Sequence, residues 1–137
     1  MNEADAGLAE LFWGVARQLR HLTHETLEPI GITPGQSRAV AVLMRHGVMR
    51  LSELSEHLRI APRSTTEVVD GLQERGLVER RPDPADRRAT LVALTPAGQA
   101  TAEAIRTARH VEAERFFAGL DAADRVTLAR ILKTLNA

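Results

Sequence analysis

The sequence has no cysteine, no tyrosine and a single lysine among its 137 residues. Without cysteine, the chain can have no disulfide, thiolate nucleophile, thiol redox switch or cysteine metal site. Aromatic residues make up only 3% of the chain, which argues against a stacking surface for single-stranded nucleic acid. These absences exclude several classes of sensing and binding mechanism.

Long apolar runs and catalytic motifs are also missing. No uninterrupted apolar run approaches the roughly 20 residues that a membrane span needs, and the segment Met1 to Asp5 is acidic, unlike a secretory signal. We therefore expect a cytoplasmic protein with no membrane partner. No G-x-x-x-x-G-K-S/T phosphate loop, HExxH zinc motif or G-x-S-x-G nucleophile motif occurs. The sequence predicts that the protein is not an enzyme, and it indicates no cofactor.

Basic and acidic residues are balanced, with 18 of each and a formal net charge of zero. A DNA-binding domain is expected to carry a basic face, so such a face must here arise from local patterning. From Arg80 to Arg88 four arginines outnumber the two aspartates, Asp83 and Asp86. We expect the positive surface to be concentrated in this short segment.

The first half of the chain shows helical patterning. Apolar residues recur every three or four positions up to about Leu27, which predicts a long first helix. Thr33-Pro34-Gly35-Gln36 is a capping-box sequence that begins a second helix, ending at about Arg45. The residues 48–51 can form a short strand.

The stretch from Leu51 to Thr95 predicts two short helices, a tight turn between them and a following hairpin. Ser52 is a suitable N-cap for the first short helix, and Pro62 opens the second. The β-favouring runs 77–80 and 89–94 flank a long loop with paired arginines at its exposed tip. This order of elements describes a winged helix-turn-helix, whose usual partner is double-stranded DNA.

Two further helices are predicted after the hairpin, one from Thr95-Pro96 to about Ala118 and one that begins near Asp121. Long helices at both ends of so small a core cannot easily bury their apolar stripes within one subunit, so we expect a two-fold homodimer. The predicted fold is mainly α with a small β wing. Its predicted organisation is a single domain over 1–137, with a winged helix-turn-helix lobe at 34–95 flanked by dimerisation helices at 1–28 and 96–137.

Three short motifs carry a resemblance to a known family. Gly76-Leu77-Val78-Glu79-Arg80, Asp86-Arg87-Arg88 and Leu94-Thr95-Pro96-Ala97-Gly98 together resemble the MarR family of dimeric winged-helix transcriptional regulators, and the helix order fits essentially the whole chain. The resemblance implies a repressor, less often an activator, that binds a pseudo-palindromic operator and is released by a small ligand or oxidant. It also implies that the second short helix enters the major groove and that wing arginines reach the minor groove.

The residues expected to contact DNA lie on the second short helix and in the wing. A helix fits the major groove and presents its first turns to base edges and phosphates, whereas arginine suits a narrow minor groove. The predicted contacts are Arg63, Ser64, Thr65, Thr66, Arg80, Arg81, Arg87 and Arg88. Asp86 either orients the guanidinium of Arg88 or merely pairs with it. Arg80 either holds a phosphate or braces the wing.

Acidic residues in the second short helix depart from the family pattern, which often has a basic residue there. Glu67 and Asp70 occupy the middle of this helix, and Gly71 is placed on a face that could meet DNA. An acid that faces phosphates lowers affinity. Glu67 therefore either accepts from a cytosine amino group or pairs with a neighbouring arginine, and we favour the pairing.

No pattern identifies an effector or a metal. By the resemblance, a pocket near the first helix makes Trp13, Arg17, His21, His24 and Arg38 eligible ligand contacts, but their spacing is not distinctive. His21 and His24 lie three apart without a third ligand, so we predict no metal site. The alternative function is a protein-interaction module on a winged-helix scaffold with weak or no specific DNA binding, because this fold does not by itself guarantee DNA binding.

Overall fold

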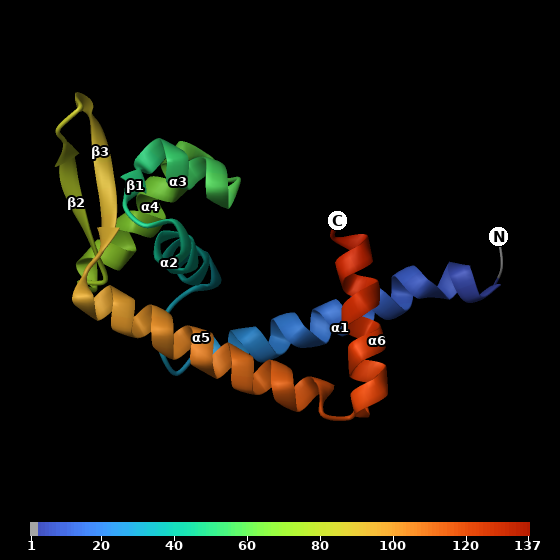
Figure 1. The fold of residues 1–137 in the computed structure, drawn as a ribbon. Coiled ribbons are helices and arrows are strands. Elements are labelled where there is room, and N and C mark those ends of the chain that lie inside the picture. Colours follow the sequence, from blue (N-terminus) through green and yellow to red (C-terminus); the bar gives the residue numbers. More distant parts are fainter. Residues whose placement is uncertain (1–2) are drawn as a thin grey trace. The chain divides into compact units, whose positions relative to one another are not determined.

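The computed structural model describes the backbone of residues 3–137 and the side chains of residues 7–137. Six helices and three strands occur in this described part of the chain (Figure 1). In order they are α1 (Glu3–Leu27), α2 (Pro34–His46), β1 (Met49–Arg50), α3 (Leu51–Leu58), α4 (Pro62–Glu74), β2 (Val78–Asp83), β3 (Asp86–Leu94), α5 (Pro96–Phe117) and α6 (Ala122–Leu135). The predicted fold class, mainly α with a small β wing, is confirmed. None of these helices is long and apolar enough to cross a membrane.

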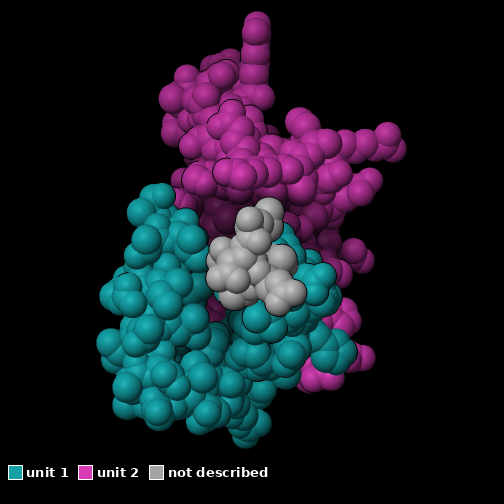
Figure 2. Space-filling model, turned by 90° about the vertical axis from the view of Figure 1, so that its right-hand side faces the viewer, with its two compact units in different colours: residues 1–23, 108–137 teal, residues 24–107 magenta. Residues whose placement is uncertain are grey.

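The chain forms two compact units, which are coloured separately in Figure 2. Unit 1 comprises residues 1–23 and 108–137, and unit 2 comprises residues 24–107. Both boundaries fall inside long helices, because α1 and α5 each run from one unit into the other. Unit 2 contains the whole of the predicted winged helix-turn-helix lobe.

The helix starts follow local capping chemistry. At α2, the Thr33 hydroxyl accepts from the backbone N–H of Gln36 and the Gln36 side chain accepts from the N–H of Thr33, both at 3.1 Å. This is the predicted capping box. The predicted cap at Ser52 is wrong, because β1 passes directly into α3 and Arg50 takes the N-cap position. There the Glu53 side chain accepts from the N–H of Arg50 at 3.2 Å.

The three strands form an antiparallel sheet in the order β1-β3-β2. Met49 of β1 is opposite Val92 of β3, and Val78 of β2 is opposite Leu94. The second and third strands form a hairpin that projects from α2, α3 and α4 within unit 2 (Figure 1). This hairpin is the predicted wing.

The wing strands are longer than the sequence pattern predicted. The expected loop ran from Arg81 to Arg88, but β2 continues to Asp83 and β3 begins at Asp86. The physical reason is that Asp83 is buried and closes the turn, accepting from the N–H of Ala85 at 2.9 Å. A register shift between Pro82 and Asp83 accommodates this tight turn.

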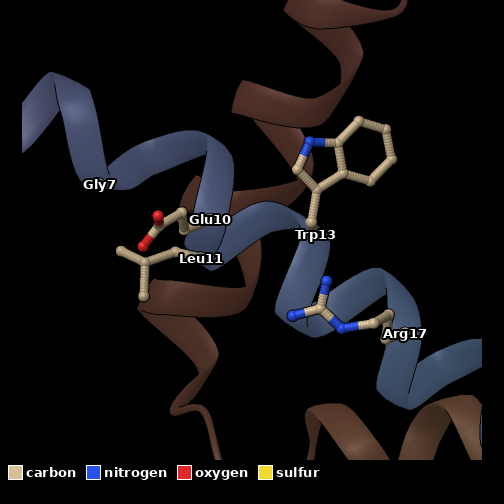
Figure 3. Close-up of a pocket in the computed structure, with 5 residues that line it drawn as sticks. All are labelled: Gly7, Glu10, Leu11, Trp13 and Arg17. Carbon is tan, nitrogen blue, oxygen red and sulfur yellow. The ribbon is translucent and has the colours of Figure 1, made fainter.

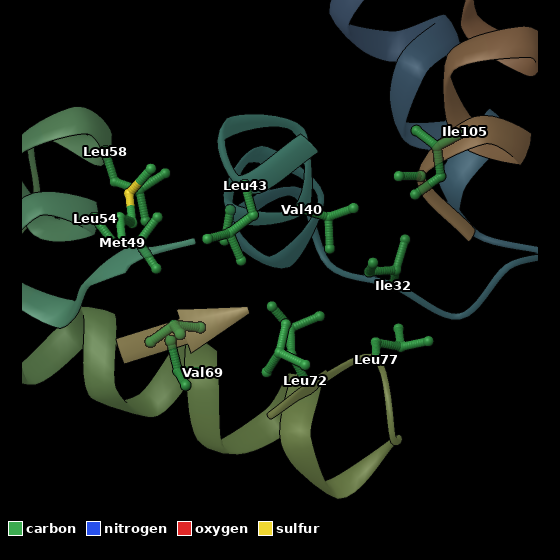
Figure 4. Packing of buried hydrophobic residues seen from close by; sticks show 14 of the residues in the cluster. Ile32, Val40, Leu43, Met49, Leu54, Leu58, Val69, Leu72, Leu77 and Ile105 are labelled. Atoms are coloured by element: carbon green, nitrogen blue, oxygen red, sulfur yellow. The ribbon is translucent and has the colours of Figure 1, made fainter. Parts of the chain in front are cut away.

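The apolar core of unit 2 fixes the orientation of α4. Leu54 of α3, Val69 and Leu72 of α4 and Val92 of β3 are all fully buried, and Val40 of α2 is 1% exposed. Figure 4 shows side chains of α2, α3 and α4 converging in this core. Since Val69 and Leu72 point inward, the opposite side of α4 faces solvent.

Candidate nucleic-acid interface

The first turn of α4 presents polar side chains to solvent. Pro62 occupies the first helical turn, as predicted, and Arg63 and Ser64 are exposed. Thr66 is half-buried, and its hydroxyl donates to the carbonyl of Pro62 at 3.0 Å. Arg63 and Ser64 are therefore available to an external partner, whereas Thr66 has part of its hydrogen-bonding capacity used within the helix.

Thr65 does not belong to this surface. Its side chain is fully buried, and the Ser55 hydroxyl donates to the Thr65 hydroxyl oxygen at 2.6 Å. Thr65 in turn donates to the carbonyl of Ala61 at 3.2 Å. The expectation that Thr65 contacts DNA is corrected, because this hydroxyl joins α3 to α4 inside the lobe.

Arg80 on β2 braces the wing against α4. Its guanidinium donates to the Asp70 carboxylate at 2.6 Å and also to the side-chain oxygen of Gln73. Only 27% of the Arg80 side chain is exposed. Of the two alternatives for Arg80, the geometry favours the brace over a phosphate contact.

The same contact revises the interpretation of the acidic residues in α4. Glu67 is exposed and forms no ion pair with any residue between 7 and 137, so the favoured pairing of Glu67 with an arginine is wrong. The paired acid is Asp70, one helical turn further on. Gly71 also faces inward, because a Cβ atom there would lie 2.6 Å from Nε2 of Gln36 on α2. It therefore packs against α2 and does not meet DNA as predicted.

The remaining predicted wing residues differ in their partners. Arg81 donates from Nε to the Glu79 carboxylate at 2.8 Å, which offsets its charge. Arg87 and Arg88 are exposed and form no ion pair within the described part of the chain. Asp86 accepts from the backbone N–H of Arg88 at 2.9 Å. Asp86 thus shapes the start of β3, and it neither orients nor pairs with the guanidinium as we expected.

Arg50 and Asp83 form a second brace that the sequence analysis did not identify. Arg50 Nε donates to the Asp83 carboxylate at 2.8 Å, which connects the junction of β1 and α3 to the wing turn. The backbone N–H of Ala85, together with Arg50, lowers the pKa of Asp83 despite its burial. The sequence does contain a signal for the turn, because Asp83 lies two residues before Ala85, and an aspartate often accepts from the N–H two residues further on in an Asx turn.

These pairings offset part of the acidic charge on the surface formed by α4 and the wing, where Glu67 stays exposed without an ion pair among the described residues. Three acids are each neutralised by an arginine: Asp70 by Arg80, Glu79 by Arg81 and Asp83 by Arg50. Among the described residues, three arginines on the same elements have no such partner: Arg63, Arg87 and Arg88. The paired acids therefore reduce the repulsion of a polyanion, while the unpaired arginines remain available to it.

Unit 1 has a different surface, with many exposed apolar side chains. On α1, Leu11 is 70% and Trp13 is 55% exposed, and on α6 Val126 and Leu135 are 71% and 70% exposed. No residue of α6 is buried. A surface of this kind is typical of a protein interaction site.

The eligible ligand contacts are only partly brought together. Trp13 and Arg17 line an open hollow along α1, with Gly7, Glu10 and Leu11 (Figure 3). Arg38 lies on α2 in the other unit. No cluster of three or more metal-ligating side chains occurs among the described residues.

Comparison with known proteins gives consistent matches. Residues 32–90 match the MarR family. The chain is 27% identical over 135 residues to the HTH-type transcriptional repressor MdtR of Bacillus subtilis. The aligned region covers 98% of this chain and 84% of MdtR. It is also 32% identical over 96 residues to the multiple antibiotic resistance protein MarR of Salmonella typhimurium. That aligned region covers 70% of this chain and 67% of the Salmonella protein.

Solved structures of MarR are also similar to this chain. A crystal structure of a MarR mutant from E. coli has a TM-score of 0.87 to this chain at 28% identity, covering 95% of this chain and 96% of that one. The same mutant in complex with operator DNA has a TM-score of 0.75 at 29% identity, covering 93% and 92%.

Proposed function

Because the chain belongs to the MarR family of DNA-binding transcriptional regulators, we propose that it is a repressor that binds a pseudo-palindromic operator as a homodimer and is released by a small ligand. The observation that carries this proposal is the pairing pattern on α4 and the wing. Each of Asp70, Glu79 and Asp83 is neutralised by an arginine, whereas Arg63, Arg87 and Arg88 have no acidic partner among the described residues. The names of two similar proteins, the repressor MdtR and the MarR mutant bound to operator DNA, support the same conclusion.

In this proposal α4 is the recognition helix and the wing contacts the backbone beside it. A helix of 13 residues fits the major groove, with Arg63 and Ser64 of its first turn directed to base edges or phosphates. The side chains of Arg87 and Arg88 suit a narrow minor groove, where the negative potential is enhanced. Arg80 contributes indirectly, because its contact with Asp70 holds the wing at a fixed position relative to α4.

The homodimer is supported by the apolar surface of unit 1. Exposed side chains such as Leu11, Trp13 and Leu135 cost free energy in water, at about 25 cal/mol for each Å² of apolar surface. A second copy that covers them recovers this free energy on both subunits at once. Two recognition helices related by a two-fold axis then match two half-sites of inverted sequence.

Release by a ligand requires a difference in affinity between two states of the dimer. A ligand shifts the population only when it binds the DNA-incompetent state more tightly than the DNA-competent state. A hollow on α1 with the charged groups of Glu10 and Arg17 is one ligand-binding candidate, and because the proposed second copy covers Trp13, which also lines it, a ligand there would bind at the dimer interface.

The test begins with random-sequence duplexes selected by the wild-type protein, followed by gel shift and footprinting. We expect an inverted repeat with half-sites about one helical turn apart and a solution mass of twice 15.0 kDa. Arg88→Ala should weaken binding and reduce the slope of log affinity against log salt by about 0.9 for each lost phosphate contact. Arg106→Ala is the matched control, because Arg106 is exposed on α5 and outside α4 and the wing.

Different results would assign a different function. Selection that enriches no sequence, with a normal solution mass, would contradict operator binding and support a protein-interaction module. An Arg88→Ala protein with the affinity and salt slope of the wild type would refute the role of the wing arginines.

A further inference from the structure

Arg75 occupies the end of α4 that is farthest from the proposed DNA contacts. It is the C-cap residue of this helix, and twelve positions separate it from Arg63. At 1.5 Å per residue this places the two about 18 Å apart along the helix axis. Arg75 is therefore not part of the surface that α4 presents with its first turn.

The guanidinium of Arg75 binds the segment that joins α1 to α2. One terminal nitrogen donates to the carbonyl of Gly31 at 2.6 Å, and the other donates to the carbonyl of Ile30 at 3.0 Å. Hydrogen bonds from a charged donor are stronger than those between neutral groups. The planar guanidinium donates to the two carbonyls from two separate nitrogens in a fixed geometry, whereas an ammonium group has all its donors on one nitrogen.

The segment that Arg75 binds is the immediate end of α1. The N–H of Gly31 donates to the carbonyls of Leu27 and Glu28 at 3.1 and 3.0 Å, and Gly31 has φ of +74°. This left-handed glycine ends the helix, so the carbonyls of Ile30 and Gly31 lie just past its C-terminus. A cation there also interacts favourably with the helix dipole.

A second attachment joins the same end of α4 to α5. The Thr95 hydroxyl donates to the carbonyl of Gly76 at 2.6 Å, and the N–H of Thr95 donates to the carbonyl of Leu77 at 3.1 Å. Thr95 directly precedes α5. The C-terminal end of α4 is thus held to both helices that run from unit 2 into unit 1, by Arg75 on one side and Thr95 on the other.

We propose that Arg75 is a positioning residue for DNA recognition: it fixes the recognition helix to the end of α1 and thereby sets the separation of the two recognition helices in the dimer. This inference rests on the proposed function, because it requires a dimer and two half-sites. The backbone hydrogen bond from Thr95 to Leu77 persists when side chains are replaced, whereas the Arg75 bridge is made by one long side chain and can be removed by a single substitution.

The lobe should fold without the bridge. Leu27 and Ile32, on either side of the bound segment, are 1% and 4% exposed, and Val69 and Leu72 anchor α4 independently. Arg75→Met keeps most of the aliphatic stem and removes the hydrogen bonds. Arg75→Lys keeps the charge and one donor position, so it should behave between Arg75→Met and the wild type.

The experiment uses three duplexes derived from the sequence that the wild-type protein selects: the natural spacing, a spacing longer by one base pair, and a single half-site. One added base pair turns the second half-site by about 35°, so the wild type should bind the longer duplex much more weakly. Arg75→Met should bind the natural spacing about five- to tenfold more weakly, with a reduced difference between the two spacings. Its affinity for the single half-site should match that of the wild type.

The binding measurements distinguish a failure of the positioning role of Arg75 from a failure of operator binding itself. Arg106→Met should bind all three duplexes like the wild type, because Arg106 is exposed on α5. Equal losses by Arg75→Met on all three duplexes, or no loss on the natural spacing, would overturn the positioning role and leave operator binding intact. Failure of the wild type to select two half-sites would refute both proposals.

A second measurement does not depend on DNA. Amide hydrogen exchange at Gly31 should be faster in Arg75→Met, since the Arg75 bridge restrains this segment. Unchanged exchange would show that the bridge does not restrain the end of α1, and it would overturn the proposal even if DNA affinity fell.

Discussion

Replacement of Gly98 by alanine tests the junction between α5 and the base of the wing. Gly98 is buried in the first turn of α5, where an added Cβ atom would lie 1.9 Å from the carbonyl oxygen of Leu77 and 3.1 Å from a methyl carbon of Leu94. The first distance is far inside van der Waals contact. Because the opposing atom belongs to the backbone, no side-chain rotation can relieve the clash.

The size of the effect follows from what must move. The Cβ atom and the Leu77 carbonyl must separate by about 1 Å, the difference between 1.9 Å and the shortest separations that real Cβ atoms show. This shift strains the hydrogen bond from the Thr95 N–H to Leu77, at a cost of about 0.5–1.5 kcal/mol. Overpacking adds about 1–3 kcal/mol, and alanine returns up to about 1 kcal/mol through helix propensity. Gly98→Ala should therefore lower the free energy of unfolding by about 0.5–4.5 kcal/mol.

Urea unfolding at a fixed protein concentration measures this difference, because the stability of the proposed dimer would depend on concentration. Gly7→Ala is the matched control: Gly7 lies inside α1, and a Cβ atom there would have no neighbour within 4 Å. The control should be as stable as the wild type or more stable. Wild-type stability of Gly98→Ala would refute the argument that close approach of the two backbones requires glycine at this position.

Two further predictions concern the acidic residues of the lobe. Asp70→Asn should strengthen binding to duplexes of unrelated sequence and steepen the salt slope by about 0.9, because Arg80 becomes available to a phosphate; unchanged binding in a salt titration would contradict this. Asp83→Asn should be less stable than the wild type at neutral pH, with a difference that shrinks as pH falls below about 3.9. The sign follows because the N–H of Ala85 and Arg50 lower the folded-state pKa of Asp83, so its contribution is present above the ordinary pKa and disappears on acidification. Urea midpoints from pH 7 to pH 3 measure this difference, and a constant difference would refute it.

The parts of the fold that the sequence predicted well depend on neighbouring residues. The capping box joins Thr33 and Gln36, which lie three positions apart, and the start of α4 at Pro62 is equally local. Such signals are readable because the interacting groups are separated by less than one helical turn. For the same reason, the order of helices and the wing followed from periodicity and turn chemistry.

The contacts that could not be predicted join residues far apart in the sequence. Arg75 lies 44 positions from Gly31, and Arg50 lies 33 positions from Asp83. Nothing in the local pattern distinguishes these arginines from solvated ones, because their partners are chosen by tertiary packing. Glu67 shows the converse error: local reasoning expected an ion pair, but the core turns Asp70 toward Arg80 and leaves Glu67 exposed.

These distant contacts also explain why a net charge of zero is compatible with DNA binding. Total charge counts every ionised group equally, but a polyanion interacts mainly with groups on the surface that meets it. On α4 and the wing, acids such as Asp70 and Asp83 are paired with arginines that brace the lobe. The same ion pairs that brace the wing against α4 therefore neutralise part of the acidic charge that would otherwise repel phosphate, while Glu67 of α4 stays exposed and unpaired among the described residues. The structural role of Arg80 thus has an electrostatic consequence for DNA binding that requires no direct contact with the nucleic acid.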